Sequence, residues 1–126
     1  MTHILTQRVV TPTGTIEDSG NTTTGDTVTS VATTVAANGG SANAVSIAFT
    51  AAGLQSIALL STVPCVVTLT GASAIDGASG STVTLAANIL RYVAAVTGDV
   101  TAVSVGANTT GSGAAGTIQI SVLFNS

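Results

Sequence analysis

Side chains able to perform acid–base, nucleophilic or metal chemistry are scarce in this chain. They comprise one histidine, one cysteine and seven charged residues: His3, Cys65, Arg8, Glu17, Asp18, Asp26, Asp76, Arg91 and Asp99. Catalysis by the abundant serines and threonines would need a base within hydrogen-bond reach. Hydrolysis by paired carboxylates needs one acid with a raised pKa, whereas the adjacent Glu17 and Asp18 are typical of a solvated turn. We therefore predict no catalytic residue and a protein that is not an enzyme.

The spacing of these residues matches no known metal or cofactor motif. Metal sites cluster His, Cys, Asp or Glu side chains. Asp76 and Asp99 stand in separate turn sequences, where Asp usually bonds to nearby backbone, and only the fold could bring them together to bind calcium. Cys65 lies in an apolar run and is interpreted as a small buried hydrophobe. The sequence therefore predicts neither a metal nor a cofactor.

The charge content excludes several classes of partner. Charged residues make up 6% of the 126 residues and the net charge is −3, with no lysine, against about 25% charged residues in an average domain. Nucleic-acid binding depends on Lys and Arg to neutralise phosphates, and two arginines far apart in the sequence are too few for it. A membrane-spanning helix needs roughly 18 consecutive apolar residues, and the apolar runs here are short, so we expect neither nucleic acid nor a membrane as a partner. The N-terminus MTHILTQRVV lacks the features of a secretory signal peptide, and we expect synthesis in the host cytoplasm. The Asn-Thr-Thr sequences at 21–23 and 108–110 are accordingly interpreted as coincidental matches to the glycosylation pattern.

From residue 26 onward the chain is a series of short β-type segments separated by small-residue turns. Their regular spacing of about 8–12 residues predicts an antiparallel β-sandwich or barrel, and we expect a single β-sandwich over residues 26–126. The spacing of Val28 and Val31 predicts a β-bulge, and Ala51–Leu60 is the best alternative for a helix. The expected strands lie in Thr27–Val35, Val45–Phe49, Leu54–Ser61, Cys65–Thr70, Thr82–Leu85, Ile89–Ala95, Val103–Val105 and Thr117–Phe124.

Residues 1–25 are predicted to form an extended N-terminal arm that orders against a neighbouring molecule. A short strand over Ile4–Val10 is expected, followed by a break in the pattern from Pro12 through Glu17–Asn21. Arg8, Glu17 and Asp18 are the expected polar contacts of this arm with a partner.

Two further features indicate contact with other subunits. Arg91 is expected to pair with carboxylates of a neighbouring subunit, a role for which Arg is well suited. The last strand alternates, with Ile118, Ile120, Val122 and Phe124 on one face, and it carries no charge that would protect an exposed edge. We expect its edge to be covered by the arm or by a neighbouring subunit. Because ordering Ser and Thr side chains costs little entropy, such an uncharged surface suits a dense, permanent assembly.

The second half of the chain resembles small β-sandwich proteins of tailed bacteriophage particles. The stretch LQSIALLSTVPCVVTLTGASAIDGASGSTVTLAAN, followed by VTAVSVGANTTGSGAAGTIQISVLFN, carries the shared layout. An apolar strand ends in Ser-Thr, a VxLT strand and a polar loop follow, and TVTLAA leads to two closing strands around an Asn/Gly/Thr loop. The layout covers about two-thirds of the chain and carries over no functional residue.

This resemblance implies a capsid decoration or cement protein, often a jelly-roll, that sits as homodimers or homotrimers on the virion. Its expected partner is the lattice of the major capsid protein, whose outer surface it would bind and whose capsomer contacts it would stabilise. The alternatives are another self-assembling phage subunit, from a tail, fibre, baseplate or minor coat, and an adhesive or carbohydrate-binding module. The last would need an aromatic platform, for which Phe49, Tyr92 and Phe124 supply little.

Overall fold

The computed structural model describes residues 2–25, 27–47 and 53–125, with side chains for only some positions before residue 24. The regular elements within these ranges are β-strands, and every strand pair is antiparallel. Of the segment 51–60, for which a helix is the alternative, residues 54–60 belong to strand β5 (Leu54–Ser61), and residues 51 and 52 lie outside the described part. The predicted all-β antiparallel sandwich is therefore confirmed.

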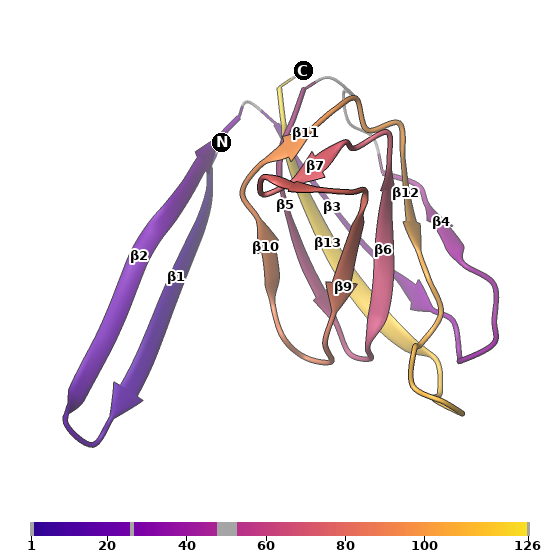
Figure 1. The fold of residues 1–126 in the computed structure, drawn as a ribbon, viewed down its shortest axis with the longest axis horizontal. Coiled ribbons are helices and arrows are strands. Elements are labelled where there is room, and N and C mark those ends of the chain that lie inside the picture. Colours follow the sequence, from indigo (N-terminus) through magenta and orange to yellow (C-terminus); the bar gives the residue numbers. More distant parts are fainter. Residues whose placement is uncertain (1, 26, 48–52, 126) are drawn as a thin grey trace.

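Eight strands build two four-stranded sheets that face each other (Figure 1). Sheet I has the order β10-β5-β13-β3, and sheet II has the order β4-β12-β6-β9. A small third sheet, β11-β7-β8, consists of the two-residue strands β7 (Ala74–Ile75), β8 (Ala78–Ser79) and β11 (Val96–Thr97). The other strands are β3 (Thr27–Val35), β4 (Asn43–Val45), β6 (Cys65–Thr70), β9 (Thr82–Leu85), β10 (Arg91–Val93), β12 (Ala102–Val105) and β13 (Gly116–Phe124).

The eight strands of the sandwich pair in a nested order. The first pairs with the last, β3 with β13, and the second with the seventh, β4 with β12. The third pairs with the sixth, β5 with β10, and the two middle strands, β6 and β9, pair with each other. The pairs β13–β5 and β12–β6 then join these ribbons into sheets I and II. The chain is therefore arranged as one long antiparallel ribbon wrapped around a core.

The core lies between the inner faces of the two sheets, as alternation along each strand requires. In β13 the predicted inward set is buried, whereas Gln119 on the opposite face is exposed. The fully or almost fully buried apolar side chains include Ile57, Leu59, Ile118, Ile120 and Val122 from sheet I and Cys65, Val67, Leu69, Val83, Leu85, Val103 and Val105 from sheet II.

Strand β13 is a central strand, which corrects the prediction about its edge. It pairs along its length with β3 on one side and with β5 on the other. Both edges are thus satisfied by strands of the same domain, and neither the arm nor a neighbouring subunit is needed to cover them. The pairing of β3 with β13 also runs without a register shift from Thr27 to Val35, so the predicted bulge at Val28–Val31 is wrong.

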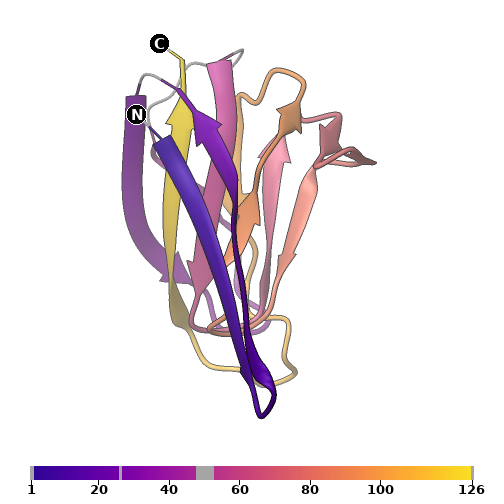
Figure 2. The ribbon, with the colours of Figure 1, turned by 90° about the vertical axis from the view of Figure 1, so that its left-hand side faces the viewer.

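The N-terminal segment forms a β-hairpin of strands β1 (Thr2–Thr11) and β2 (Gly14–Thr24), joined at Pro12-Thr13. The predicted strand over Ile4–Val10 is confirmed, but the predicted break at 17–21 is wrong. The register shifts where Thr6 lies opposite Ser19-Gly20, so a bulge absorbs the irregular sequence and β2 continues. Figure 1 shows the hairpin beside the sandwich, and Figure 2 shows it in front of the sandwich. In both views its turn lies at the end away from the two termini.

The junction between the hairpin and β3 packs on the outer face of sheet I. A Cβ added at Gly25 would lie 2.9 Å from Cγ of Leu123 and 3.0 Å from the carbonyl oxygen of Phe124. Leu123 points away from the core and is nevertheless fully buried. The first three residues of β3, Thr27–Thr29, are half-buried on both faces of the strand.

Candidate interaction surface

The structure brings three of the four predicted contact residues into the hairpin and places the fourth on the sandwich. The backbone register sets Arg8 directly opposite Glu17, and Asp18 opposite Gln7. The side chains of these residues lie outside the described part of the chain, so their contacts with a partner remain a prediction. Arg91 lies on β10 and pairs with Leu59 of β5.

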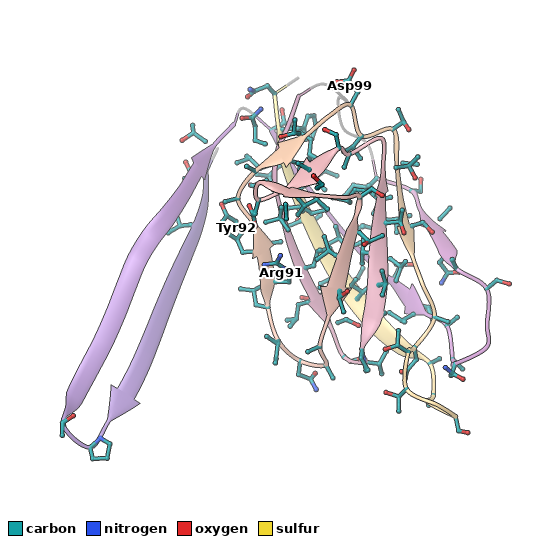
Figure 3. The ribbon with its side chains drawn as sticks, viewed as in Figure 1. Arg91, Tyr92 and Asp99 are labelled. Atoms are coloured by element: carbon teal, nitrogen blue, oxygen red, sulfur yellow. The ribbon has the colours of Figure 1, made fainter. Side chains whose placement is uncertain are left out.

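Arg91 follows an apolar tip that the sequence analysis assigned to a strand. Ile89 and Leu90 are 61% and 53% exposed, because β10 begins only at Arg91. Asn88, at φ 59°, turns the chain into this tip, and its N–H donates to the carbonyl of Ser61 over 2.7 Å. Figure 3 shows Arg91 and Tyr92 together on β10, and Asp99 at the end of the molecule nearest the termini. The tip therefore presents two large apolar side chains immediately before Arg91 in the chain.

The outer face of sheet I contains an open hollow of about 380 Å³. Two cross-strand rows form its floor: Ser121 of β13 lies between Ser30 and Ala58, and Gln119 lies between Ala32 and Leu60. Leu90 of the apolar tip closes one side. The hollow is lined by Ser30, Val31, Ala32, Ala58, Leu59, Leu60, Leu90, Gln119, Ile120 and Ser121, all of them uncharged. Such a surface suits contact with another protein and offers no acid, base or nucleophile–base pair.

Asn108 holds the loop before β13 in one conformation. Its side chain is 4% exposed; Nδ2 donates to the carbonyl of Ala114 and Oδ1 accepts from the N–H of Thr110, each over 2.9 Å. Its backbone N–H donates to Ala36 and its carbonyl accepts from Nδ2 of Asn38. In the folded protein Nδ2 of Asn108 is therefore buried and already donates a hydrogen bond.

Asp76 uses its carboxylate within the small third sheet. Oδ1 accepts the N–H groups of Ala94 and Ala95, over 2.9 and 3.0 Å, and the N–H of Asp76 donates back to Ala95. These bonds join residues 18 and 19 positions apart in the chain, so they differ from the local backbone bonding that was expected of Asp in a turn. Among the residues that the structure describes, no group of three or more His, Cys, Asp or Glu side chains is placed to hold a metal ion.

Cys65 is fully buried in the core, as predicted. Burial raises the pKa of its thiol above the ordinary 9.0, and a hydrogen bond with Ser61 acts in the opposite direction. The thiol donates to Oγ of Ser61 over 3.6 Å. A raised pKa keeps the thiol protonated near neutral pH, which suppresses its reactivity.

Within residues 2–25, 27–47 and 53–125, the structure contains no helix of the length and apolar character needed to span a bilayer. Comparison of the chain with protein-family models, with characterised proteins and with solved structures gives no match. We therefore base the proposed function on the surface of the chain and on the order in which its strands pair.

Proposed function

We propose that this chain is a structural virion protein that decorates the outer surface of a capsid and stabilises the contacts between capsomers. The observation that carries the proposal is the nested pairing of eight strands in two facing sheets. We infer from this nested pairing that the sandwich is a jelly-roll, an architecture used repeatedly in viral capsid domains. In this proposal the protein is made in the host cytoplasm and has no catalytic role.

The distribution of charge supports a role in extended protein contacts. In the described part of the sandwich the charged residues are Asp76, Arg91 and Asp99, and none lies on β3, β5 or β13. The exposed residues of these strands are mainly Ser, Thr, Ala and Gln. Interfaces are depleted in Lys, Glu and Asp, so sheet I can be covered at a small desolvation cost.

The mechanism is stabilisation by mass action. A protein that binds the assembled lattice and not its free subunits shifts the equilibrium toward the lattice. An oligomer that contacts several capsomers gains avidity, so modest single contacts give durable attachment. We assign the hairpin, with Arg8, Glu17 and Asp18, and the apolar tip with Arg91 to contacts of this kind.

The test uses heads and tails of the phage whose genome encodes the chain, purified without the protein. The expected result is saturable co-sedimentation with expanded heads, no binding to tails, and a higher temperature of head disruption. Binding to tails alone, or growth of the pure protein into tubes or fibres, would replace the proposal with a tail or fibre subunit. Binding to glycans without binding to heads would replace it with an adhesive module.

A pair of variants tests the apolar tip in the same assay. The double substitution Ile89→Ser with Leu90→Ser is expected to weaken head binding at least tenfold, because it removes two exposed apolar side chains without touching the core. Ala87→Ser, at an exposed position of the same turn, is the matched control and should bind as the unmodified protein does. Equal binding by all three proteins would exclude the tip from the contact.

A further inference from the structure

Strand β3 leaves a long edge of sheet I open. Among the described residues it pairs with β13 alone, over nine residues and in unbroken register. The other edge strands are short: β4 and β10 have three residues each, and β9 has four. Strand edges are usually protected by charge, proline, bulges or short length. The sequence TVTSVATTV of β3 has none of these features.

The hydrogen bonds of Thr34 show which residues of β3 face the open side. The Thr34 carbonyl accepts from Nδ2 of Asn43 over 2.5 Å, so the backbone of Thr34 points away from β13. Backbone groups of successive residues in an antiparallel strand point alternately to the two sides. The N–H and C=O groups of Val28, Ser30 and Ala32 therefore point to the open side.

We propose that β3 pairs antiparallel with β3 of a second copy of this chain around a twofold axis, with Ser30 opposite its own counterpart. The bond from Asn43 already occupies the carbonyl of Thr34. The register that pairs the outward groups of Val28, Ser30 and Ala32 and leaves Thr34 outside the ladder sets Val28 opposite Ala32 and centres on Ser30. It forms about six inter-strand hydrogen bonds and joins the two copies of sheet I into one continuous sheet.

The sequence of β3 is compatible with pairing to itself. In this register Thr29 faces Val31 of the other copy, so β-branched side chains meet across the axis, a favourable cross-strand combination. On the outer face Ser30 and Ala32 are small and exposed, which lets a second strand approach. No like charges meet. A twofold contact of this type is closed, so it ends at a dimer and does not continue into a fibre.

The pairing also joins the two hollows on the outer face of sheet I. Ser30 and Ala32 line each hollow on the side of the open edge. Two hollows related by the axis would therefore form one uncharged surface across the dimer. Only the purpose of this surface, contact with capsomers, rests on the proposed function; the dimer itself can be tested without capsids.

The first experiment is sedimentation velocity of the purified protein over a range of concentrations. We expect a concentration-dependent dimer that Ser30→Lys weakens at least tenfold, because the two ammonium groups would lie opposite each other. Gln119→Lys is the matched control, since this exposed residue adds the same charge to the same face one strand away from the edge. Mixing Ser30→Lys with Ser30→Glu should restore dimers. Because Ser30 is exposed, circular dichroism should show that the Ser30→Lys and Ser30→Glu variants are folded.

The second experiment tests the register. Residues opposite each other in a hydrogen-bonded antiparallel pair have Cα atoms about 5.5 Å apart, within the range that a disulfide spans. Ser30→Cys should therefore form a covalent dimer under mild oxidation. Ala32→Cys should not, because the two copies of this residue would be offset by four positions, more than about 10 Å. Cys65 is buried and should not interfere.

A protein that is monomeric at every concentration would overturn the inference, and so would a dimer unaffected by Ser30→Lys. Cross-linking through Ala32→Cys but not Ser30→Cys would reject the register. Head binding measured in parallel separates the two proposals. A dimer that binds no heads would reject the decoration role and support the strand pairing. A monomer that binds heads would reject the strand pairing and support the decoration role.

Discussion

Replacing Asn108 by alanine is the sharpest test of how the loop between β12 and β13 is held. The substitution removes the donor for the Ala114 carbonyl and the acceptor for the Thr110 N–H, two bonds of 2.9 Å made by a side chain that is 4% exposed. Each lost bond contributes about 1 kcal/mol, and a buried group left without a partner adds about 1 kcal/mol or more. We expect the free energy of unfolding to fall by about 3 kcal/mol.

Urea unfolding followed by far-UV circular dichroism measures this loss, since the chain has no Trp. A change of this size should lower the melting temperature by roughly 10 °C. Thr109→Ala, at an exposed position of the same loop, is the matched control and should change stability by less than about 0.5 kcal/mol. Equal stability of the Asn108→Ala and Thr109→Ala variants would refute the assignment of Asn108 as the residue that organises this loop.

A double-mutant cycle with Gly113 isolates the contact. A Cβ at residue 113 would lie 2.6 Å from Cγ of Asn108, so Gly113→Ala alone should be destabilising. Once Asn108 is replaced by alanine, that overlap is gone and the same Cβ should be tolerated. The double variant should therefore lose less stability than the sum of the single variants. Strict additivity would contradict the packing of Asn108 against Gly113.

Two further predictions concern the core and a turn. Gly98 has φ 100°, and a Cβ there would lie 2.5 Å from the Gly71 carbonyl oxygen, so Gly98→Ala should lower the free energy of unfolding by about 3 kcal/mol. Gly77 has φ 82° and no neighbour within 4 Å, so Gly77→Ala should lower it by only about 1 kcal/mol. Equal losses in urea unfolding would contradict the steric argument. Burial raises the pKa of the Cys65 thiol in the folded state above its ordinary 9.0. The stability that this thiol contributes is therefore fully present below the unfolded pKa and is lost as pH rises from there toward the folded pKa. Cys65→Ala should lack this alkaline decline in the free energy of unfolding, and identical pH profiles of the two proteins would refute it.

The local pattern of each strand could be predicted from the sequence, but the partners of the strands could not. Alternation in 117–124 identified the buried face of β13 because side-chain direction follows from the strand period alone. Its central position depends on pairing with residues 27–35 and 54–61, which no local pattern encodes. Phe49, expected at the end of the second strand, lies outside the described residues.

The surface features were missed for related reasons. Ile89 and Leu90 have the composition of a strand, but the turn at Asn88 leaves them outside β10. Ser19-Gly20 has the composition of a break, yet the opposite strand accommodates it as a bulge. The open edge of β3 follows only from the order of the strands, although its lack of charge was visible in the sequence.

The nested pairing has a consequence for biosynthesis. Strands β3 and β5 are not neighbours in sheet I, because β13 lies between them and pairs with both. A nascent chain that has reached residue 115 therefore contains β3 and β5 but lacks β13, the strand that joins them. Sheet I can form completely only when residues 116–124 have left the ribosome. Long-range pairing of this kind slows folding. A chain truncated before β13 would lack the joined sheet, so assembly would select for subunits whose synthesis has passed that strand.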